Sequence, residues 1–245
     1  MYNFFTQSAM INDRFEIVGA DFNHIKNVLR LKIGDKIIIS NNGTSNLCKI
    51  ESFSDSSVIA VIEQENYNDT SLPVSVTLFQ GLPKSDKMEL IIQKAVELGV
   101  DEIVPVEMAR SIVKLDGKKA DSKIARWQAI AESAAKQSKR TAIPTVNSAI
   151  SFADAIKLAK DMDVLIVPYE NKDGMAATLS ALKSIKRDMK IGVMIGPEGG
   201  FDDNEIALAE SAGGKVVSLG KRILRTETAA ITALSMIMLY AETAL

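Results

Sequence analysis

The spacing of apolar residues along this chain differs before and after residue 70. In the first part, short runs rich in β-branched residues are separated by turn signals such as Asn42-Gly43, and this pattern predicts short β-strands. Between Asp21 and Arg30 the apolar spacing becomes helical, which predicts one or two turns of helix capped by Asp21. Residues 1–70 are therefore expected to form a small β-barrel domain. Its predicted strands are Lys36–Ser40, Leu47–Phe53 and Ser57–Glu63.

Strand-like and helix-like segments alternate through residues 71–245, after a polar segment that we expect to be a linker, Asn66–Pro73. This alternation predicts an α/β domain with a mostly parallel sheet. Asp86 with Glu89, and Asp202 with Glu205, have the spacing of capping boxes at two helix starts. The predicted strands are Val74–Gln80, Ile103–Val106, Val164–Val167, Ile191–Ile195 and Val216–Leu219. The predicted helices lie within 86–99, 124–134, 175–185, 202–211 and 227–241.

The composition excludes several kinds of site. One cysteine, Cys48, and one histidine, His24, cannot form a disulfide or a Cys/His zinc site, and a single cysteine fits a reducing compartment such as the cytoplasm. The chain start lacks the features of a signal peptide, and the apolar run Ala229–Ala241 predicts a buried helix because it is too short to span a membrane. No Walker A loop or G-x-G-x-x-G fingerprint is present.

Two of the predicted strands end at glycine. Ile191–Ile195 runs into GPEGGF, residues 196–201, and Val216–Leu219 runs into GKRILR, residues 220–225. Ligands bind at the carboxyl ends of parallel strands, so these two ends predict a ligand site. From spacing alone the first loop could equally be a tight turn. The apolar pair Ile223 and Leu224 in the second could cover a flat ligand or pack at a subunit contact.

The motifs themselves are more specific than their spacing. GPEGGF followed by LGKRILRTETA closely resembles the RsmE family, the 16S ribosomal RNA uridine-N3 methyltransferases of the SPOUT class. Lys136 and Lys139 depart from the pattern, because the family more usually has Glu and Gly there. Further segments that match the family in order are His24–Arg30, Gln93–Val100, Arg126-Trp127, Gln137-Ser138, Arg140, Pro144 and Pro168–Glu170.

The resemblance implies a fold that composition does not show. The catalytic domain, residues 71–245, would be a SPOUT-type parallel sheet with a C-terminal trefoil knot. Residues 1–70 would be a PUA-like RNA-binding barrel. The family binds S-adenosylmethionine in the knot and works as a homodimer, without a metal, on 16S ribosomal RNA of the small subunit. The long apolar helix expected near the C-terminus suits a dimer contact.

The same resemblance points to the residues of the site. S-adenosylmethionine would lie against three loops, where the apolar side chains suit the flat adenine and the backbone groups can read its edges. The expected cofactor-binding residues are Pro168, Tyr169, Glu170, Ile195, Gly196, Gly200, Leu219, Gly220, Ile223, Leu224 and Thr228.

Methylation of uridine N3 requires loss of the N3 proton and leaves negative charge spread onto O2 and O4 of the ring. Arg225 is the expected catalytic residue that stabilises this charge, because its guanidinium stays protonated and can bond two acceptors. Glu198 is the candidate proton acceptor, with bonding of backbone N–H groups in its own turn as the alternative. Two rival functions remain: methylation of another RNA position, such as a ribose 2′-hydroxyl, and non-catalytic RNA binding in ribosome assembly.

An RNA surface has to be local, since the chain carries a net charge of −2. Residues 110–140 hold nine cations against three anions, which by charge alone indicates a solvated face and with the family resemblance indicates a phosphate-binding surface. Trp127, on an apolar helical stripe, is expected in the core. The expected RNA-binding residues are Arg30, Arg110, Arg126, Lys136, Lys139 and Arg140.

Overall fold

The structure, a computed structural model, describes residues 1–115, 117–170 and 174–245, without the side chains of Lys118 and Lys119. These residues form two compact units. The first comprises Met1–Ser71 and Ala135–Ile143, and the second comprises Leu72–Ala134 and Pro144–Leu245. The segment Ala135–Ile143 thus belongs with the N-terminal residues, although it lies far from them in the sequence.

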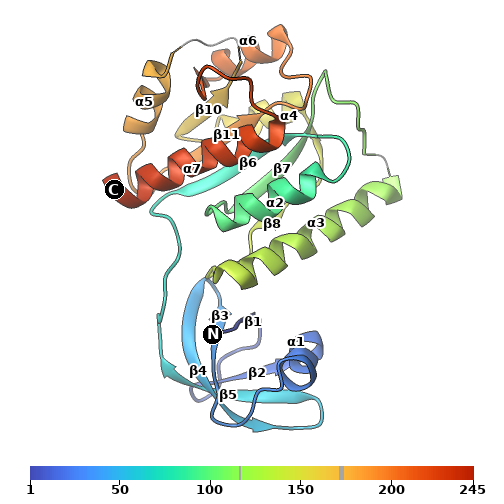
Figure 1. The fold of residues 1–245 in the computed structure, drawn as a ribbon, viewed down its shortest axis with the longest axis vertical. Helices are drawn as coiled ribbons and strands as arrows, with labels where there is room; N and C mark the ends of the chain where they lie inside the picture. Colours follow the sequence, from blue (N-terminus) through green and yellow to red (C-terminus); the bar gives the residue numbers. More distant parts are fainter. Residues whose placement is uncertain (116, 171–173) are drawn as a thin grey trace. The chain divides into compact units, whose positions relative to one another are not determined.

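The first unit is a five-stranded sheet with the strand order β1-β3-β4-β5-β2 (Figure 1). Strand β1 pairs with β3 in parallel, and the other pairs are antiparallel. The three predicted strands are confirmed as β3, β4 and β5, whereas the short strands β1 and β2 were not predicted. The strands are β1 (Asn3–Phe5), β2 (Arg14–Val18), β3 (Lys36–Asn41), β4 (Thr44–Phe53) and β5 (Ser57–Gln64).

A helical segment follows β2, as α1 (Gly19–Asn23) and the π-helical turn η1 (His24–Val28). The prediction that Asp21 caps this helix is wrong, because the helix begins two residues earlier and Asp21 lies inside it. The Asp21 carboxylate instead accepts a hydrogen bond of 2.8 Å from Lys136 Nζ, at the end of α3. The Asp21 side chain, predicted to cap the helix, therefore forms a tertiary ion pair instead.

The core of the first unit is apolar and includes the cysteine. Cys48 is fully buried, as are Ile25, Ile37 and Ile50 around it. Burial, helped by the charge of Glu63, raises the pKa of the Cys48 thiol to about 12. A thiol in that environment behaves as a small apolar side chain.

The second unit is built on a parallel sheet with the order β12-β10-β11-β6-β7-β8, and β9 also pairs with β7. Every pair in this sheet is parallel, which confirms the predicted α/β class. The strands are β6 (Ser75–Gly81), β7 (Glu102–Glu107), β8 (Thr145–Val146), β9 (Ile150–Ser151), β10 (Val164–Pro168), β11 (Lys190–Ile195) and β12 (Lys215–Val217).

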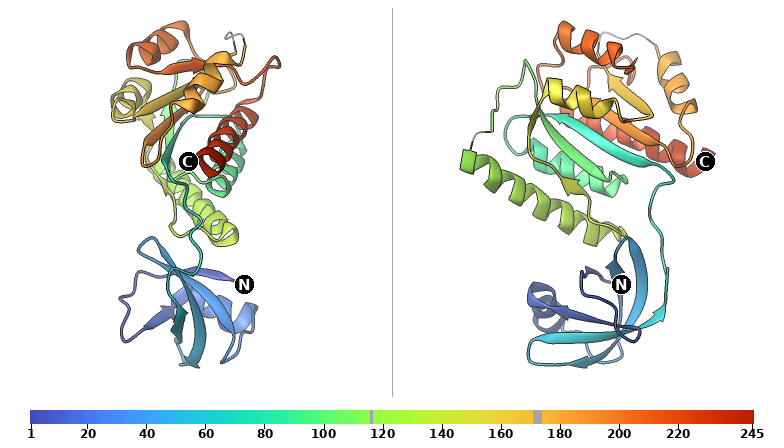
Figure 2. Two further views of the ribbon diagram at one scale, coloured as in Figure 1. Left: turned by 90° about the vertical axis from the view of Figure 1, so that its left-hand side faces the viewer. Right: turned by 180° about the vertical axis from the view of Figure 1, so that it is seen from behind.

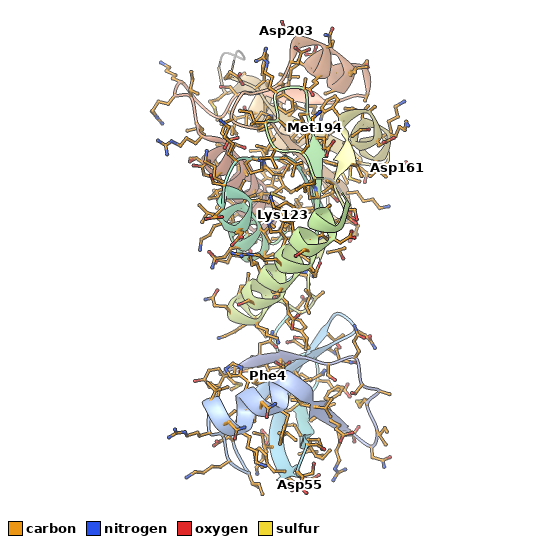
Figure 3. The ribbon with its side chains drawn as sticks, turned by 90° about the vertical axis from the view of Figure 1, so that its right-hand side faces the viewer. Phe4, Asp55, Lys123, Asp161, Met194 and Asp203 are labelled. Atoms are coloured by element: carbon orange, nitrogen blue, oxygen red, sulfur yellow. The ribbon has the colours of Figure 1, made fainter. Side chains whose placement is uncertain are left out.

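Helices cover both faces of this sheet, with α2 and α7 side by side on one face and α4 and α6 on the other (Figure 2). On the α4 and α6 face, Phe79 and Met194 pack against Phe152 and Phe201, and Figure 3 labels Met194 among the packed side chains of this unit. Trp127 is buried as predicted. The helices are α2 (Lys87–Glu97), α3 (Gly117–Ser138), α4 (Phe152–Ala159), α5 (Ala176–Lys183), α6 (Asp203–Ser211) and α7 (Thr226–Ala244).

The two predicted capping boxes have different outcomes. At α6 the box is confirmed, since Asp202 accepts from a backbone N–H of the first turn and Glu205 accepts from the Asp202 N–H at 2.9 Å. At α2 the prediction is wrong, because the Asp86 side chain makes no capping hydrogen bond. The Asp86 backbone has φ −88° and ψ 8°, whereas a capping side chain usually belongs to an extended residue.

Helix α7 returns from the sheet edge to the middle of the unit. It packs against α2, β11 and α5. Ala230, Ala233, Leu234 and Ile237 are buried, whereas Leu239 is 61% exposed. Within the described part of the chain, no helix is long and apolar enough to cross a membrane.

Candidate functional site

Two adjoining cavities lie at the carboxyl ends of β10, β11 and β12, the strands that end in the two glycine-marked loops and in Pro168–Glu170. The smaller has a volume of about 90 Å³ and the larger about 370 Å³. Five residues line both: Pro168, Glu170, Ile223, Leu224 and Ala229. The three loops therefore surround one continuous site, as the shared edge of a parallel sheet predicts.

The glycine loop, residues 196–201, forms one wall and is held by several hydrogen bonds. The Gly200 N–H donates to the Pro197 carbonyl at 2.9 Å, and Arg110 Nη1 donates to the Gly199 carbonyl at 3.0 Å. Gly200 has φ +68°, a left-handed conformation that favours glycine, whereas the nearest atom to a Cβ there belongs to the movable carboxylate of Glu170. Contacts within the chain therefore hold this wall in place.

A network of buried side chains at the end of β6 and the start of α7 also holds the glycine loop. The Thr226 hydroxyl, at the first position of α7, donates to the Gly196 carbonyl at 2.7 Å. It also accepts a hydrogen bond of 3.0 Å from Gln80 Nε2, at the end of β6. Gln80 is fully buried and Thr226 is 5% exposed. The start of α7, the end of β6 and the glycine loop are thus joined through one hydroxyl.

Glu198 projects into the larger cavity but is not a free carboxylate. Its Oε1 accepts from Lys87 Nζ at 2.8 Å and from the Lys84 N–H at 3.1 Å. Partial burial acts to raise the pKa of Glu198, but the hydrogen bonds from Lys87, from its own N–H and from the Lys84 N–H, with the charge of Lys87, outweigh it and lower the pKa. The same hydrogen bond raises the pKa of Lys87. Both groups are therefore held in their charged forms.

The opposite wall, residues 218–225, is far more open. Ile223 is 86% exposed although it lines both cavities, and Lys221, Arg222 and Arg225 are exposed as well. Gly220 has φ +113°, and nothing lies within 4 Å of a Cβ built on it. An apolar side chain held so far into solvent beside a cavity is a surface that a flat ligand could cover.

The structure brings most of the predicted site residues together. Arg225 and Glu198 both line the larger cavity, and every predicted cofactor residue lines one cavity or both except Thr228. Thr228 is exposed on α7 and lines neither. Sequence reasoning missed Lys87, Phe201, Thr226 and Ala229, which also line the larger cavity. Among the described residues, no group of three His, Cys, Asp or Glu side chains could hold a metal ion.

Comparisons with known proteins show the family of the chain. The family described as "RNA methyltransferase domain" matches residues 70–238, and the "RNA methyltransferase PUA domain" matches residues 17–63. The ribosomal RNA small subunit methyltransferase E of Bacillus subtilis (strain 168) is 40% identical over 93% of this chain and 91% of its own length. The chain belongs to the ribosomal RNA small subunit methyltransferase E family. The corresponding protein of Mesomycoplasma hyopneumoniae (strain 232) is 34% identical over 94% of this chain and 96% of its own.

A solved structure of the methyltransferase E family is also similar to the chain. The Neisseria gonorrhoeae protein, crystallised with S-adenosyl methionine bound, superimposes with a TM-score of 0.84 and is 31% identical. The match covers 98% of this chain and 97% of the Neisseria chain. The likeness therefore extends over residues of both units.

The cations predicted to contact RNA in this methyltransferase E chain differ in their surroundings. Arg30, Arg110, Arg126 and Lys139 are exposed. Arg126 pairs with Glu89 at 2.8 Å, and the Glu89 hydrogen bond raises the pKa of Arg126. Lys136 is half-buried in its ion pair with Asp21. Arg140 is only 4% exposed, and its carbonyl accepts hydrogen bonds from the first unit, so its place is interior.

The departure at Lys139 has a backbone consequence. Lys139 follows the end of α3 with φ +59°, in the left-handed region. Glycine is the residue that most readily ends a helix in that conformation, and it is also the residue that the family resemblance leads us to expect here. This chain places a cation on a strained backbone position instead.

The missed site residues left different signals in the sequence. Thr226 stands inside the LRTET segment, directly before the predicted helix, where a hydroxyl commonly bonds local backbone. Lys87 left none, because its partner Glu198 lies 111 residues away and only the fold joins them. Lys87 of this methyltransferase E chain could be found only from the structure.

Proposed function

We propose that the chain is an S-adenosylmethionine-dependent methyltransferase that methylates N3 of a uridine in 16S ribosomal RNA of the small subunit. The observation that carries the proposal is the larger cavity, where Arg225, at the end of the second glycine-marked loop, lines the same space as the glycine loop. The family to which the chain belongs and the bound S-adenosyl methionine in its Neisseria relative support it. The ribosomal substrate would place the reaction in the cytoplasm.

The chemistry of the cavity fits the proposed cofactor. Leu219, Ile223 and Leu224 offer apolar surface of the kind that adenine needs, and Ile223 is 86% exposed among the residues that the structure describes. The glycine loop opposite provides backbone groups that can bond polar edges. S-adenosylmethionine, when bound, supplies a methyl group already activated on a sulfonium, so the chain needs no metal for this transfer.

Residues of the chain have to stabilise the negative charge that develops on the uracil ring. Loss of the N3 proton would leave charge on N3, O2 and O4. N3 would then bond the methyl carbon while the bond from that carbon to the sulfonium sulfur breaks and the sulfur keeps the electron pair. Arg225 lies in the larger cavity and is exposed, so its N–H groups are available to the ring oxygens. Donors placed where charge develops lower the barrier because they are oriented before the reaction.

Glu198 is poorly suited to accept the N3 proton. Its lowered pKa means that the protonated carboxyl is disfavoured, and general bases work best with a pKa near the working pH. The hydrogen bonds to Lys84 and Lys87 support the alternative role, in which Glu198 holds the glycine loop. The N3 proton would then leave to another acceptor, while Arg225 stabilises the anion.

RNA would be held by exposed cations on each unit. In the second unit these are Arg110 and Arg126, and in the first unit Arg30 and Lys139. Lys136 would contribute less because Asp21 neutralises it, and Arg140 would support the fold from the interior. Phosphate contacts of this kind give affinity and salt dependence, whereas the cavity selects the base. The PUA-like unit would add RNA surface to the catalytic unit.

Two further features belong to the proposal. The return of α7 from the edge strand β12 to α2 and β11 is compatible with a C-terminal segment threaded through a loop, the trefoil knot of SPOUT enzymes. The exposed Leu239 on α7 and Leu90 on α2 offer an apolar surface for a homodimer. Light scattering after size-exclusion chromatography would give twice the chain mass if the dimer forms and the single chain mass if it does not.

Isothermal titration with S-adenosylmethionine tests the proposed function at its first step. Saturable binding, lost or weakened in Ile223→Ala, supports a cofactor site in the cavity. No binding to the folded wild type would sink the enzyme hypothesis and leave a non-catalytic RNA-binding protein. Binding without methylation of uridine N3, but with methylation of a ribose, would instead indicate the rival RNA position.

A further inference from the structure

One ammonium group joins three segments at the larger cavity. Lys87 Nζ lies 2.8 Å from Glu198 Oε1 and 3.6 Å from Glu227 Oε2. Lys87 is the first residue of α2, Glu198 belongs to the glycine loop, and Glu227 lies in the first turn of α7. Lys87 itself lines the cavity. The cluster thus contains one cation between two carboxylates.

Glu227 depends on this cation more than its distance suggests. Its side chain is 14% exposed, and its Oε2 atom is buried and accepts no hydrogen bond. A buried carboxylate is costly unless a charge or a donor compensates it, and the 3.6 Å separation from Lys87 gives charge without a hydrogen bond. Removing the ammonium would leave Glu198 and Glu227 as two anions with no cation between them.

The position of Lys87 in its own helix gives no local reason for a cation. The start of a helix carries partial positive charge, so lysine at the first position of α2 is electrostatically unfavourable there. Its stabilising contacts are tertiary, with the glycine loop and α7. The unfavourable interaction of Lys87 with the start of its own helix is therefore offset by its ion pairs with Glu198 and Glu227.

The two segments that Lys87 joins are the ones that frame the proposed reaction. Glu198 lies in the loop whose backbone faces the cavity, and Glu227 stands two residues after Arg225. The ion pairs that Lys87 makes with both would act beside the Thr226–Gly196 hydrogen bond, at the part of the glycine loop around Glu198. The position of that part of the loop would affect where a bound cofactor and Arg225 stand relative to each other.

We propose that Lys87 is a positioning residue for methyl transfer, whose ammonium clamps Glu198 of the glycine loop to Glu227 of α7. The inference rests on the proposed function, since the clamp matters only if the cavity binds cofactor and substrate. Without the ammonium, Glu198 loses its partner and repels Glu227, so the tip of the glycine loop shifts although the Thr226–Gly196 hydrogen bond still holds its base. Cofactor binding then weakens and turnover falls while the fold persists.

The test compares Lys87→Met, Lys87→Arg and wild type by S-adenosylmethionine titration and by steady-state methylation of ribosomal RNA. Lys94→Met is the matched control, because Lys94 lies on the same helix in an ion pair of 2.8 Å with Glu97 and lines neither cavity. We expect Lys87→Met to weaken cofactor binding about tenfold and to lower kcat as well. Lys87→Arg should recover most of both, because a guanidinium can bond two carboxylates at once.

Equal cofactor binding and kcat in Lys87→Met and Lys94→Met, measured well below the melting temperature of both, would overturn the clamp. Failure of Lys87→Arg to recover either quantity would also count against it. If Lys87→Met does not fold, Glu227→Gln serves instead, since it keeps the Lys87–Glu198 pair and removes only the second anchor. Unchanged binding and turnover there would overturn the proposal. Absence of cofactor binding in wild type would contradict the proposed function rather than the clamp.

Discussion

The two loops that face each other across the larger cavity differ in how completely the chain forms them. The glycine loop is held by hydrogen bonds from Thr226, Arg110 and Lys87. The opposite loop carries Ile223 at 86% exposure. A formed wall costs little ordering entropy on binding, whereas an open wall gains apolar contact with the ligand. The contrast implies that one loop positions the ligand and the other closes over it.

The largest expected effect concerns activity alone. Arg225→Ala should lower kcat by about 10²–10³, the usual loss when one oriented donor to a developing anion is removed. Because Arg225 is exposed, the melting temperature should change little. Steady-state methylation of ribosomal RNA and thermal unfolding measure the two quantities. Arg187→Ala, another exposed arginine that lines neither cavity, is the control, and equal kcat in both variants would contradict the assignment.

The formed loop should respond in stability as well as in binding. Thr226→Val keeps the shape but leaves the buried Gln80 amide and the Gly196 carbonyl without the hydroxyl. The expected loss is about 1–3 kcal/mol in the free energy of unfolding, with weaker cofactor binding. Urea denaturation compares it with Thr228→Val, whose side chain is exposed. Similar unfolding free energies in the two variants would show that the network does not hold the loop.

A substitution in the open loop should weaken cofactor binding but leave the stability of the fold unchanged. Ile223→Ala should leave the unfolding free energy nearly unchanged, because the side chain is 86% exposed in the protein alone. Covering that side chain with adenine would contribute about 1–2 kcal/mol to binding, so the variant should bind S-adenosylmethionine about tenfold more weakly. Calorimetric titration tests this, with Ile112→Ala, also exposed at 70%, as the control. If Ile223→Ala destabilised the fold but bound normally, the open-wall account would be wrong.

The smallest expected effect is the pH dependence that Glu198 contributes. Its pKa is lower in the folded protein than in the unfolded chain, so its contribution to stability is present above the unfolded pKa. It is lost as the pH falls through the folded pKa. For a partly exposed pair we expect less than about 1 kcal/mol. Comparing urea unfolding of wild type and Glu198→Gln at neutral and acidic pH measures it, and a difference that grows on acidification would have the wrong sign.

The architecture of the second unit was predictable because its longer parallel strands are apolar runs, and most of these runs stop at glycine or proline. The same logic placed the two glycine-marked loops together, since carboxyl ends of parallel strands share one edge. The α6 capping box was predictable because its contacts are local. Short elements such as β8 and β9 escaped prediction, because two residues hold no periodicity.

The side-chain partnerships of the site could not be predicted in the same way. Lys87 meets Glu198 and Glu227 only after the fold brings the start of α2 to the cavity. Asp21 is not a helix cap because α1 begins at Gly19, and its carboxylate pairs with Lys136 instead. Asp86 makes no capping hydrogen bond, and its backbone is not extended. Local spacing shows which groups are available, and tertiary structure decides which of them meet.

The most direct test of the central claim is the 3-methyluridine content of 16S ribosomal RNA, measured by mass spectrometry of its nucleosides. In a strain lacking the protein, one 3-methyluridine should be absent. Expression of the wild-type chain should restore it, and expression of Arg225→Ala at the same level should not. An unchanged content of 3-methyluridine in the strain without the protein would contradict the proposed function.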